Sequence, residues 1–222
     1  MTALNLDNSM PGDHTIFRAV NTFARHTAWL HSPTLAYATY GVVLFAGLLV
    51  AGWWVARSTG DHSKVAAAWW TPLGALLALA INQPIVNDIR EARPYTVLPH
   101  ILVLAHRSTD YSFPSDHAVM AGAVAGGLVL VDRRLGVLAV LAALLMAFAR
   151  VYIGAHWPGD VAFGLALGAV VVVGGFKVLE RPAVALVGWL ITTPLRPLLV
   201  AQAAPGSRTT GSGRNQEGFP SN

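Results

Sequence analysis

The chain has 222 residues, of which 54% are hydrophobic and only 12% are charged. A soluble domain usually carries about 25% charged residues, so this chain has too few charges to cover a soluble surface. The absence of cysteine excludes disulfides and cysteine nucleophiles, and the net charge of +4 comes without the basic, aromatic-rich runs typical of nucleic-acid binding.

The first predicted element is an amphipathic helix near the N-terminus. Residues 1–12 are polar and are expected to be loose. Between residues 13 and 31 the apolar side chains recur at helical spacing, with arginines and other polar residues between them. We expect this helix to lie in the membrane interface. The alternative is an extramembrane helix that packs on the rest of the protein.

Five apolar stretches approach the roughly 20 residues that a bilayer span requires. They cover residues 35–56, 66–86, 115–131, 135–153 and 159–178, and tryptophans at the end of the first and the start of the second fit an interfacial aromatic belt. Prolines interrupt residues 183–200, for which we favour an interfacial helix over a sixth span. The expected fold is an all-α polytopic transmembrane bundle, one domain over residues 1–202 with a disordered tail at 203–222.

The basic residues of the connections predict the orientation of the bundle. With five spans, one side of the membrane receives segments 57–64 and 132–134 and everything after residue 179. These segments carry Arg57, Lys64, Arg133, Arg134 and Arg181. Positively charged connections stay in the cytoplasm, so we expect a cytoplasmic C-terminus and an opposite, extracytoplasmic face that holds the polar segment 87–115.

Ser115, Asp116 and His117 stand directly before the third predicted span. A serine after a proline and before an apolar run is typical of a helix N-cap. Free backbone N–H groups and the positive end of the helix dipole make such a position a ready anion site. The alternative is a simple cap with a surface histidine.

Arg150, His156 and Asp160 connect the fourth and fifth spans. Pro158 suits the first position of a helix, which places Asp160 in the first helical turn. From there its carboxylate can reach one nitrogen of His156, fix the imidazole tautomer and leave the other nitrogen free. Taken singly, Arg150 could be an arginine that snorkels to the interface, and Asp160 a charge favoured at a helix start.

Arg93 follows the second span in the sequence Arg-Glu-Ala-Arg-Pro. A guanidinium group binds phosphate oxygens through paired donors, whereas a positioning charge paired with Asp88 or Glu91 is the alternative. All three blocks fall at span ends on the same predicted face. Ionisable residues in such an apolar chain are functional by default, and this set predicts a phosphate-transfer site in an integral-membrane phosphatase.

These residues resemble the motifs of the type-2 phosphatidic acid phosphatase (PAP2) superfamily, which are Lys-x6-Arg-Pro, Pro-Ser-Gly-His and Ser-Arg-x5-His-x3-Asp. The third motif matches in its Arg, His and Asp spacing, although Ala149 replaces the serine. In the second, Asp116 replaces glycine, and Phe113-Pro-Ser-Asp-His is the variant of the bacitracin-resistance (BcrC-like) branch of undecaprenyl-diphosphate phosphatases. In the first, Val86 occupies the lysine position, and Arg90 is the candidate replacement.

The resemblance implies a role for each residue. His156 would be the nucleophile that forms a phosphohistidine, Asp160 would orient it, and His117 would protonate the leaving oxygen. The phosphoryl oxygens would be held by Arg93, Arg150, Ser115 and backbone N–H groups. Neither a metal nor a cofactor is implied, and the partners are the bilayer and a lipid phosphate, here undecaprenyl diphosphate; the oligomeric state stays unassigned.

Two other functions compete with this one. The first is a PAP2-type phosphatase for another lipid phosphate, such as phosphatidate, phosphatidylglycerophosphate or a polyprenyl monophosphate. The second is a transporter that uses Arg93, Arg150 and Asp160 as an ion relay, which the position of these charges at span ends disfavours because transporter sites lie near the midplane. Asp116 is expected among the substrate-binding residues, although a carboxylate repels phosphate unless it faces an arginine or selects a second feature of the substrate.

Overall fold

The computed structural model describes residue 10 and residues 12–201, and these contain helices and no strands. The polar segment 1–9 and the predicted tail at 203–222 lie outside this part of the chain. The helices are α1 (Asp13–His26), the short 3-10 helix η1 (Ala28–Leu30), α2 (His31–Thr59), α3 (His62–Ile89), α4 (Pro94–Val97), α5 (Asp116–Val131), α6 (Arg133–Tyr152), α7 (Pro158–Leu190) and α8 (Arg196–Leu199).

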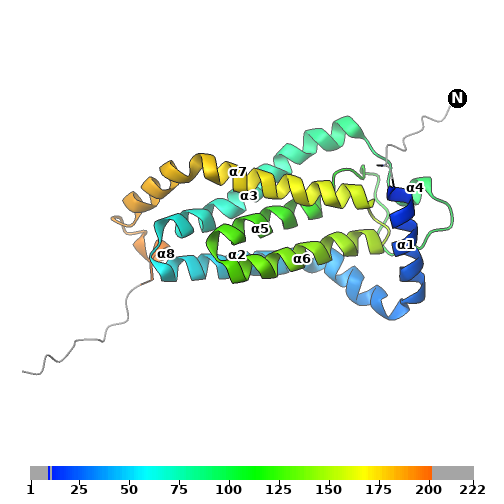
Figure 1. Cartoon of the computed structure of the whole chain (residues 1–222), viewed down its shortest axis with the longest axis horizontal. Coiled ribbons are helices and arrows are strands. Elements are labelled where there is room, and N and C mark those ends of the chain that lie inside the picture. The colour runs from blue at the N-terminus through cyan, green and yellow to red at the C-terminus, as the bar shows by residue number, and fades with distance from the viewer. Residues whose placement is uncertain (1–9, 11, 202–222) are drawn as a thin grey trace, which may run out of the picture.

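Helices α2, α3, α5, α6 and α7 run along the long axis of the molecule, and α1 crosses one end of them (Figure 1). The segments Ala28–Thr59, His62–Val97, Arg133–Tyr152 and Pro158–Leu190 are long and apolar enough to cross a membrane. The third predicted span is the 16-residue helix α5, which at 1.5 Å per residue is about 24 Å long. The predicted transmembrane helix bundle is thus confirmed, with one helix shorter than the roughly 30 Å hydrocarbon core.

The short helix α5 lies at the centre of the bundle, packed against α3, α6 and α7. Its contact with α7 is backbone to backbone. A Cβ atom at Gly122 would stand 2.2 Å from the carbonyl oxygen of Leu165, and one at Gly168 would stand 2.0 Å from that of Val119. Small residues let two helices approach in this way inside a membrane, and here they fix the position of the start of α5 relative to the start of α7.

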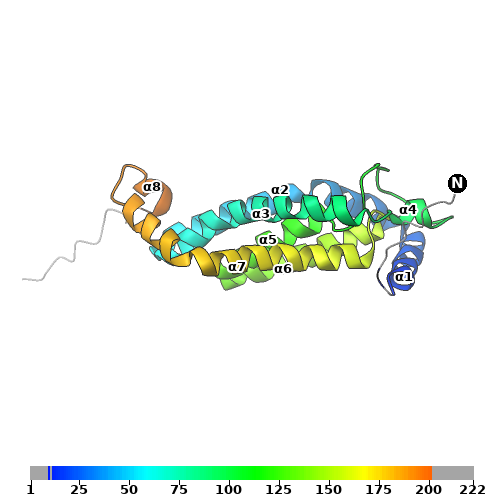
Figure 2. The same cartoon turned by 90° about the horizontal axis from the view of Figure 1, so that it is seen from above.

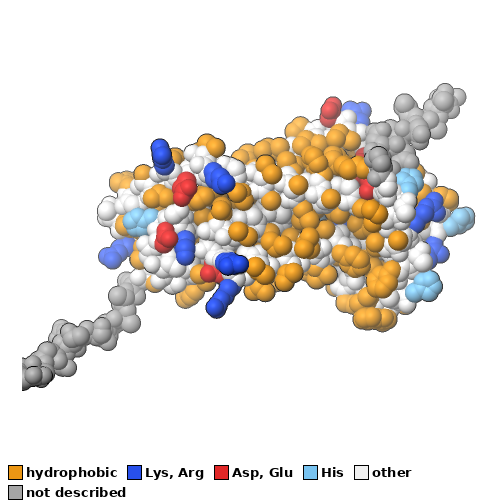
Figure 3. All heavy atoms as spheres, in the orientation of Figure 1, with side chains coloured by type: hydrophobic (Ala, Val, Ile, Leu, Met, Phe, Trp, Pro, Cys, Tyr) orange, Lys and Arg blue, Asp and Glu red, His pale blue; other side chains and the backbone are white. Residues whose placement is uncertain are grey.

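The outer surface of the bundle is apolar. Large hydrophobic side chains on the outer helices are exposed, among them Val43, Val50, Leu141 and Val170. They form a broad hydrophobic region in the middle of the molecule, and charged side chains gather towards its two ends (Figure 3). A surface of this kind is stable against lipid and would aggregate in water.

Helix α1 begins and ends close to where the sequence predicts it, but its apolar face is covered by protein. Phe17 and Ala24 are fully buried, in clusters with residues of α5, α6, α7 and the loop after α4. Ile16 and Phe23 remain exposed. The helix thus packs on the end of the bundle, and the expected position of its exposed apolar side chains in the membrane interface stays a prediction.

Residues 183–200 form neither a separate interfacial helix nor a sixth span. Helix α7 continues through Pro182 to Leu190, because the apolar residues on both sides of the proline keep packing on α3 while a single backbone hydrogen bond is lost. The chain then turns into α8, which folds back beside the end of α2 (Figure 2). Two hydrogen bonds hold it there, from Trp53 Nε1 to Leu198 O (2.8 Å) and from Ala201 N to Arg57 O (3.0 Å).

Candidate active site

A cavity of about 400 Å³ opens at the end of the bundle that α1 crosses. Its wall combines apolar residues of α2 and α3 with polar residues of the loops after α4 and α6. The lining residues that carry chemistry are Gln83, Arg93, His106, Asp110, Asp116, His117, Arg150 and His156. The structure therefore brings together five of the residues predicted from the sequence, Arg93, Asp116, His117, Arg150 and His156.

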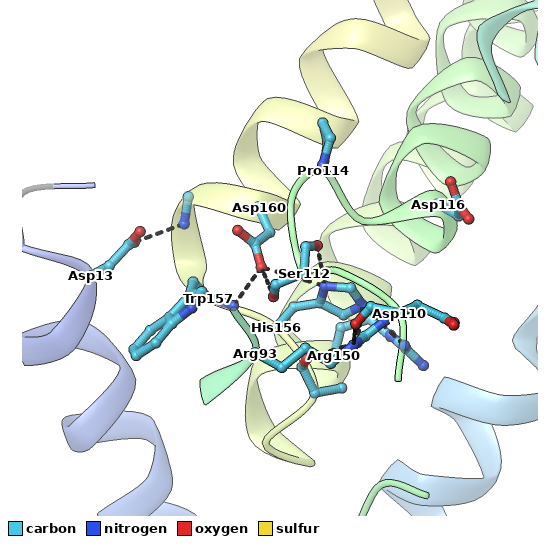
Figure 4. Close-up of polar contacts among 12 residues, drawn as sticks. Asp13, Arg93, Asp110, Ser112, Pro114, Asp116, Arg150, His156, Trp157 and Asp160 are labelled. Atoms are coloured by element: carbon cyan, nitrogen blue, oxygen red, sulfur yellow. Dashed lines mark hydrogen bonds and ion pairs between the residues drawn. The ribbon is translucent and has the colours of Figure 1, made fainter. Parts of the chain in front are cut away.

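His156 is nearly fully buried, and its Nε2 atom meets two guanidinium groups. Arg93 Nη1 lies 3.2 Å from Nε2, and Arg150 Nη2 lies 3.1 Å from it (Figure 4). Because arginine can only donate, Nε2 accepts both hydrogen bonds and carries a lone pair. Arg93 is fixed further by donating to the carbonyl oxygens of Ala155 (2.9 Å) and Asp110 (3.0 Å).

The other ring nitrogen of His156 fixes the tautomer. Nδ1 lies 2.9 Å from the carbonyl oxygen of Ser112, to which its proton is donated. Asp160 Oδ2 is 3.4 Å from Nδ1 and instead accepts hydrogen bonds from the hydroxyl of Ser112 and from the backbone N–H of Trp157 (2.9 Å). His156 and Asp160 thus lie close together, but the predicted hydrogen bond between them is replaced by others. The Asp160 carboxylate accepts from Ser112 and Trp157, and the imidazole N–H donates to the carbonyl oxygen of Ser112.

This environment keeps the His156 imidazole neutral. Burial lowers its pKa well below the usual value of 6.5, and the positive charges of Arg150 and Arg93 lower it further. A neutral imidazole with a proton on Nδ1 presents the Nε2 lone pair towards the arginines and the cavity. The arrangement is that of a nitrogen nucleophile beside an oxyanion-binding pair.

His117 and Asp116, at the start of α5, occupy another part of the cavity wall. Asp116 faces neither Arg93 nor Arg150: its Oδ1 accepts hydrogen bonds from Asn82 Nδ2 (2.7 Å) and Gln83 Nε2 (3.1 Å) of α3. In Figure 4 it points away from the cluster around His156. Two amide donors of α3 thus satisfy the carboxylate of Asp116 and fix its direction.

Ser115 and Arg90 are placed outside the cavity wall. Ser115 is the N-cap residue of α5, as predicted, but its hydroxyl makes no cap hydrogen bond and is buried. Arg90 ends α3 with a left-handed backbone (φ 53°), and its Nε donates to the carbonyl oxygen of Asn87 (2.9 Å). The side chain of Arg90 therefore stays next to its own helix, while Val86 itself lines the cavity at the position where the family has lysine.

One contact of the site leaves no signal in the sequence. Ser112 precedes Phe113-Pro-Ser-Asp-His by one position and contacts His156 through its carbonyl oxygen, which every residue type possesses. Asn82 and Gln83 do offer a signal, since two adjacent amides within an apolar span require partners. Their partner, Asp116, is known only once the register of α3 against α5 is known.

Residues 67–182, more than half of the chain, match the PAP2 superfamily. Undecaprenyl-diphosphatase BcrC of Bacillus subtilis is 30% identical over 183 residues, which are 79% of this chain and 89% of that protein. Decaprenylphosphoryl-5-phosphoribose phosphatase of Mycobacterium tuberculosis is 40% identical over 99 residues, which are 44% of this chain and 53% of that protein.

Solved structures share the fold. The transmembrane PAP2-type phosphatidylglycerolphosphate phosphatase of Bacillus subtilis superposes with a TM-score of 0.52 at 21% identity, covering 76% of this chain and 86% of that one. Aquifex aeolicus LpxE gives a TM-score of 0.51 at 20% identity, covering 73% and 93%. With a neutral histidine and two arginines at one cavity wall, a bundle of membrane-spanning helices and these similarities, the chain belongs to the PAP2 superfamily and is a multi-pass membrane phosphatase.

Proposed function

We propose that this phosphatase hydrolyses undecaprenyl diphosphate to the monophosphate at the extracytoplasmic face, through a phosphohistidine on His156. The observation that supports this most is the pair of guanidinium groups 3.1 and 3.2 Å from Nε2. A phosphoryl group that accepts these N–H donors comes to lie directly in front of the Nε2 lone pair. The donors are already in place before charge develops, which is the arrangement that stabilises a phosphoryl transition state.

The reaction then needs two displacements. Nε2 of His156 forms a bond to the terminal phosphorus, and the bond from that phosphorus to the bridging oxygen breaks. His117 donates a proton to the departing lipid monophosphate, a general-acid contribution of about 10²–10⁴ in rate. Water next attacks the phosphohistidine, gives its proton to His117 and releases inorganic phosphate, which restores the enzyme.

The choice of a polyprenyl diphosphate rests on two observations. One relative that matches along most of the chain is an undecaprenyl-diphosphatase. The cavity is also bounded by apolar residues of the two helices next to it, Leu35 and Ala38 of α2 and Val86 of α3, which suit a lipid chain. A second candidate is a decaprenyl-linked phosphate ester, since the more similar but shorter match is a decaprenylphosphoryl-5-phosphoribose phosphatase.

The proposed orientation follows from the basic residues at the two ends of the bundle. At the end with α8 lie Arg57, Lys64, Arg133, Arg134, Lys177, Arg181 and Arg196. At the cavity end lie Arg18, Arg25, Arg90, Arg93, Arg107 and Arg150, of which Arg93 and Arg150 line the cavity. When Arg93 and Arg150 are set aside as site residues, the α8 end carries more basic residues than the cavity end. This excess favours a cytoplasmic position for the α8 end and an extracytoplasmic position for the cavity.

The substrate is tested with purified protein in detergent by phosphate release from undecaprenyl diphosphate, undecaprenyl monophosphate, phosphatidate and phosphatidylglycerophosphate. We expect the highest kcat/KM for the diphosphate and no loss in EDTA, since no three His, Asp or Glu side chains between residues 12 and 201 gather as a metal site. A preference of about tenfold or more for another lipid would overturn the substrate assignment. Activity that disappears in EDTA and returns with magnesium would overturn the histidine mechanism.

The orientation is tested by introducing single cysteines into a chain that has none. Thr109, in the exposed loop at the cavity end, and Arg133, exposed at the opposite end, are matched sites. We expect Thr109→Cys to react with an impermeant maleimide in intact cells and Arg133→Cys to react only after the cells are opened. The reverse pattern would place the cavity in the cytoplasm.

A further inference from the structure

Asp13 lies behind the candidate nucleophile rather than in the cavity. It is the first residue of α1 and is 4% exposed. Its Oδ1 accepts a hydrogen bond of 2.8 Å from the backbone N–H of Gly159, which is 146 positions away in the sequence. Gly159 stands in the first turn of α7, next to Asp160 and three residues after His156. A buried carboxylate at the start of α1 therefore accepts a hydrogen bond from a backbone N–H group at the start of α7.

The contact satisfies a need at the start of α7. The first N–H groups of a helix have no partner within it, and a buried one without a partner is costly. Asp160 satisfies the N–H of Trp157 from within the helix, and Asp13 satisfies that of Gly159 from outside. Glycine at residue 159 permits this approach, since a Cβ atom there would stand 2.8 Å from Asp13 Oδ2 and would displace that side chain.

The neighbours of Asp13 on α1 hold the same segment. The ring of His14 stacks on Trp157, with centroids 4.7 Å apart and planes inclined by 11°, and Phe17 meets the Trp157 ring edge to face at 5.3 Å. Trp157 in turn donates from Nε1 to the carbonyl oxygen of Ala92 (2.9 Å), directly before Arg93. The first turns of α1 thus connect both the His156 segment and the Arg93 segment.

We infer that Asp13 is a positioning residue for phosphoryl transfer: by capping α7 from α1, it fixes the segment 156–160 and hence the angle at which His156 faces the phosphorus. The inference rests on the proposed function in taking His156 as the nucleophile. Asp13 itself touches neither the cavity nor Nε2, so its effect should fall on turnover and leave substrate binding alone.

The test compares Asp13→Ala with Asp13→Asn in purified full-length protein. The asparagine keeps an oxygen acceptor for Gly159 N–H but loses the charge and the acceptor for Met10 N–H, to which Asp13 Oδ2 is now bonded (2.9 Å). We expect Asp13→Ala to lower kcat about tenfold with KM within about twofold, and Asp13→Asn to keep at least about half of kcat. Thr15→Ala, on the exposed side of the same turn, is the matched control and should behave as wild type.

Hydrogen–deuterium exchange gives a readout that does not depend on activity. In Asp13→Ala the amides of residues 157–161 should exchange about tenfold faster than in wild type and in Asp13→Asn, while those of α5 should not change. A normal kcat for Asp13→Ala would overturn the inference, and so would a change in its KM with no change in kcat. A folded Asp13→Asn protein with the same fall in kcat as Asp13→Ala would overturn it too. If Asp13→Ala does not fold, Asp13→Asn alone decides between these outcomes.

Failure of the proposed function would be recognised separately. If wild type prefers another lipid phosphate, the kcat ratios are measured on that lipid and keep their meaning. If His156→Ala retains turnover, the nucleophile is wrong whatever Asp13 does.

Discussion

The two ends of the bundle each contain a hollow, and the comparison shows what makes one of them a site. The cavity near α1 measures about 400 Å³ and is lined by arginines, histidines and two aspartates, among other residues. The hollow between α3, the end of α7 and α8 is larger, about 530 Å³, and is lined only by tryptophan, leucine, valine, alanine and proline. Volume therefore does not distinguish them, whereas fixed polar donors do.

The two ends also differ in how their connecting segments are held. Near the cavity, Ile153 O accepts hydrogen bonds from Leu104 N (3.0 Å) and Ala105 N (3.1 Å), and Asn21 forms a two-way pair with the backbone of Leu102 (2.7 and 3.0 Å). At the other end, α8 is attached mainly by packing and the two bonds to α2. Catalysis needs the first kind of support, because a misplacement of about 1 Å at a reacting group costs about 10²-fold in rate.

The largest effect is expected at the nucleophile. His156→Ala should lower kcat by about 10⁴-fold or more, because it removes the Nε2 atom that both arginines face. The measurement is phosphate release by protein of normal yield and monodispersity. Retention of about a tenth of wild-type activity would show that His156 is not the nucleophile.

The next effect compares one arginine at each end. Arg150→Lys should lower kcat about 10²-fold, because an ammonium group cannot reproduce the planar donors that face Nε2 and the phosphoryl oxygens. Arg57→Lys is the control at the α8 end, where the guanidinium lies 5.0 Å from the Trp54 ring centroid, and should leave kcat within about twofold. Equal losses in both variants would mean that the change acts through the fold.

A pH profile gives a smaller and more specific difference. The positive charge of Arg150 disfavours the imidazolium form, so its removal in Arg150→Gln raises the pKa of His156 towards 6.5. The imidazole is then protonated at higher pH, and the acid limb of kcat/KM should move to higher pH than in wild type. Arg133→Gln, at the other end, should not move it. An acid limb that stays in place or moves down in Arg150→Gln would contradict the assigned neutral form.

The smallest effect is expected in the apolar hollow. Leu186→Ala removes a half-exposed side chain from its wall and should leave kcat and KM within about twofold of wild type, with a modest fall in thermal stability. A large change in KM for lipid substrates would show that this end takes part in substrate binding after all.

Prediction from the sequence worked best for charged residues and histidines, because in such an apolar chain few roles other than function explain them. The spans and the meeting of Arg93, Arg150 and His156 followed from hydropathy and motif spacing. The role of the Ser112 carbonyl did not, because backbone contacts leave no trace in residue identity. The continuation of α7 beyond Pro182 was missed because proline normally ends a helix, whereas here packing against α3 outweighs one lost hydrogen bond.

The two arginine donors on Nε2 also shield the proposed nucleophile. An imidazole lone pair that is already shared with two cations is a poor target for neutral electrophiles and for stray protons. An incoming oxyanion competes for those same donors, so under the proposed mechanism the act of binding exposes the Nε2 lone pair. Selectivity for phosphate is in this sense built into the resting state: the substrate uncovers its own reaction partner, and a molecule without anionic oxygens leaves it covered.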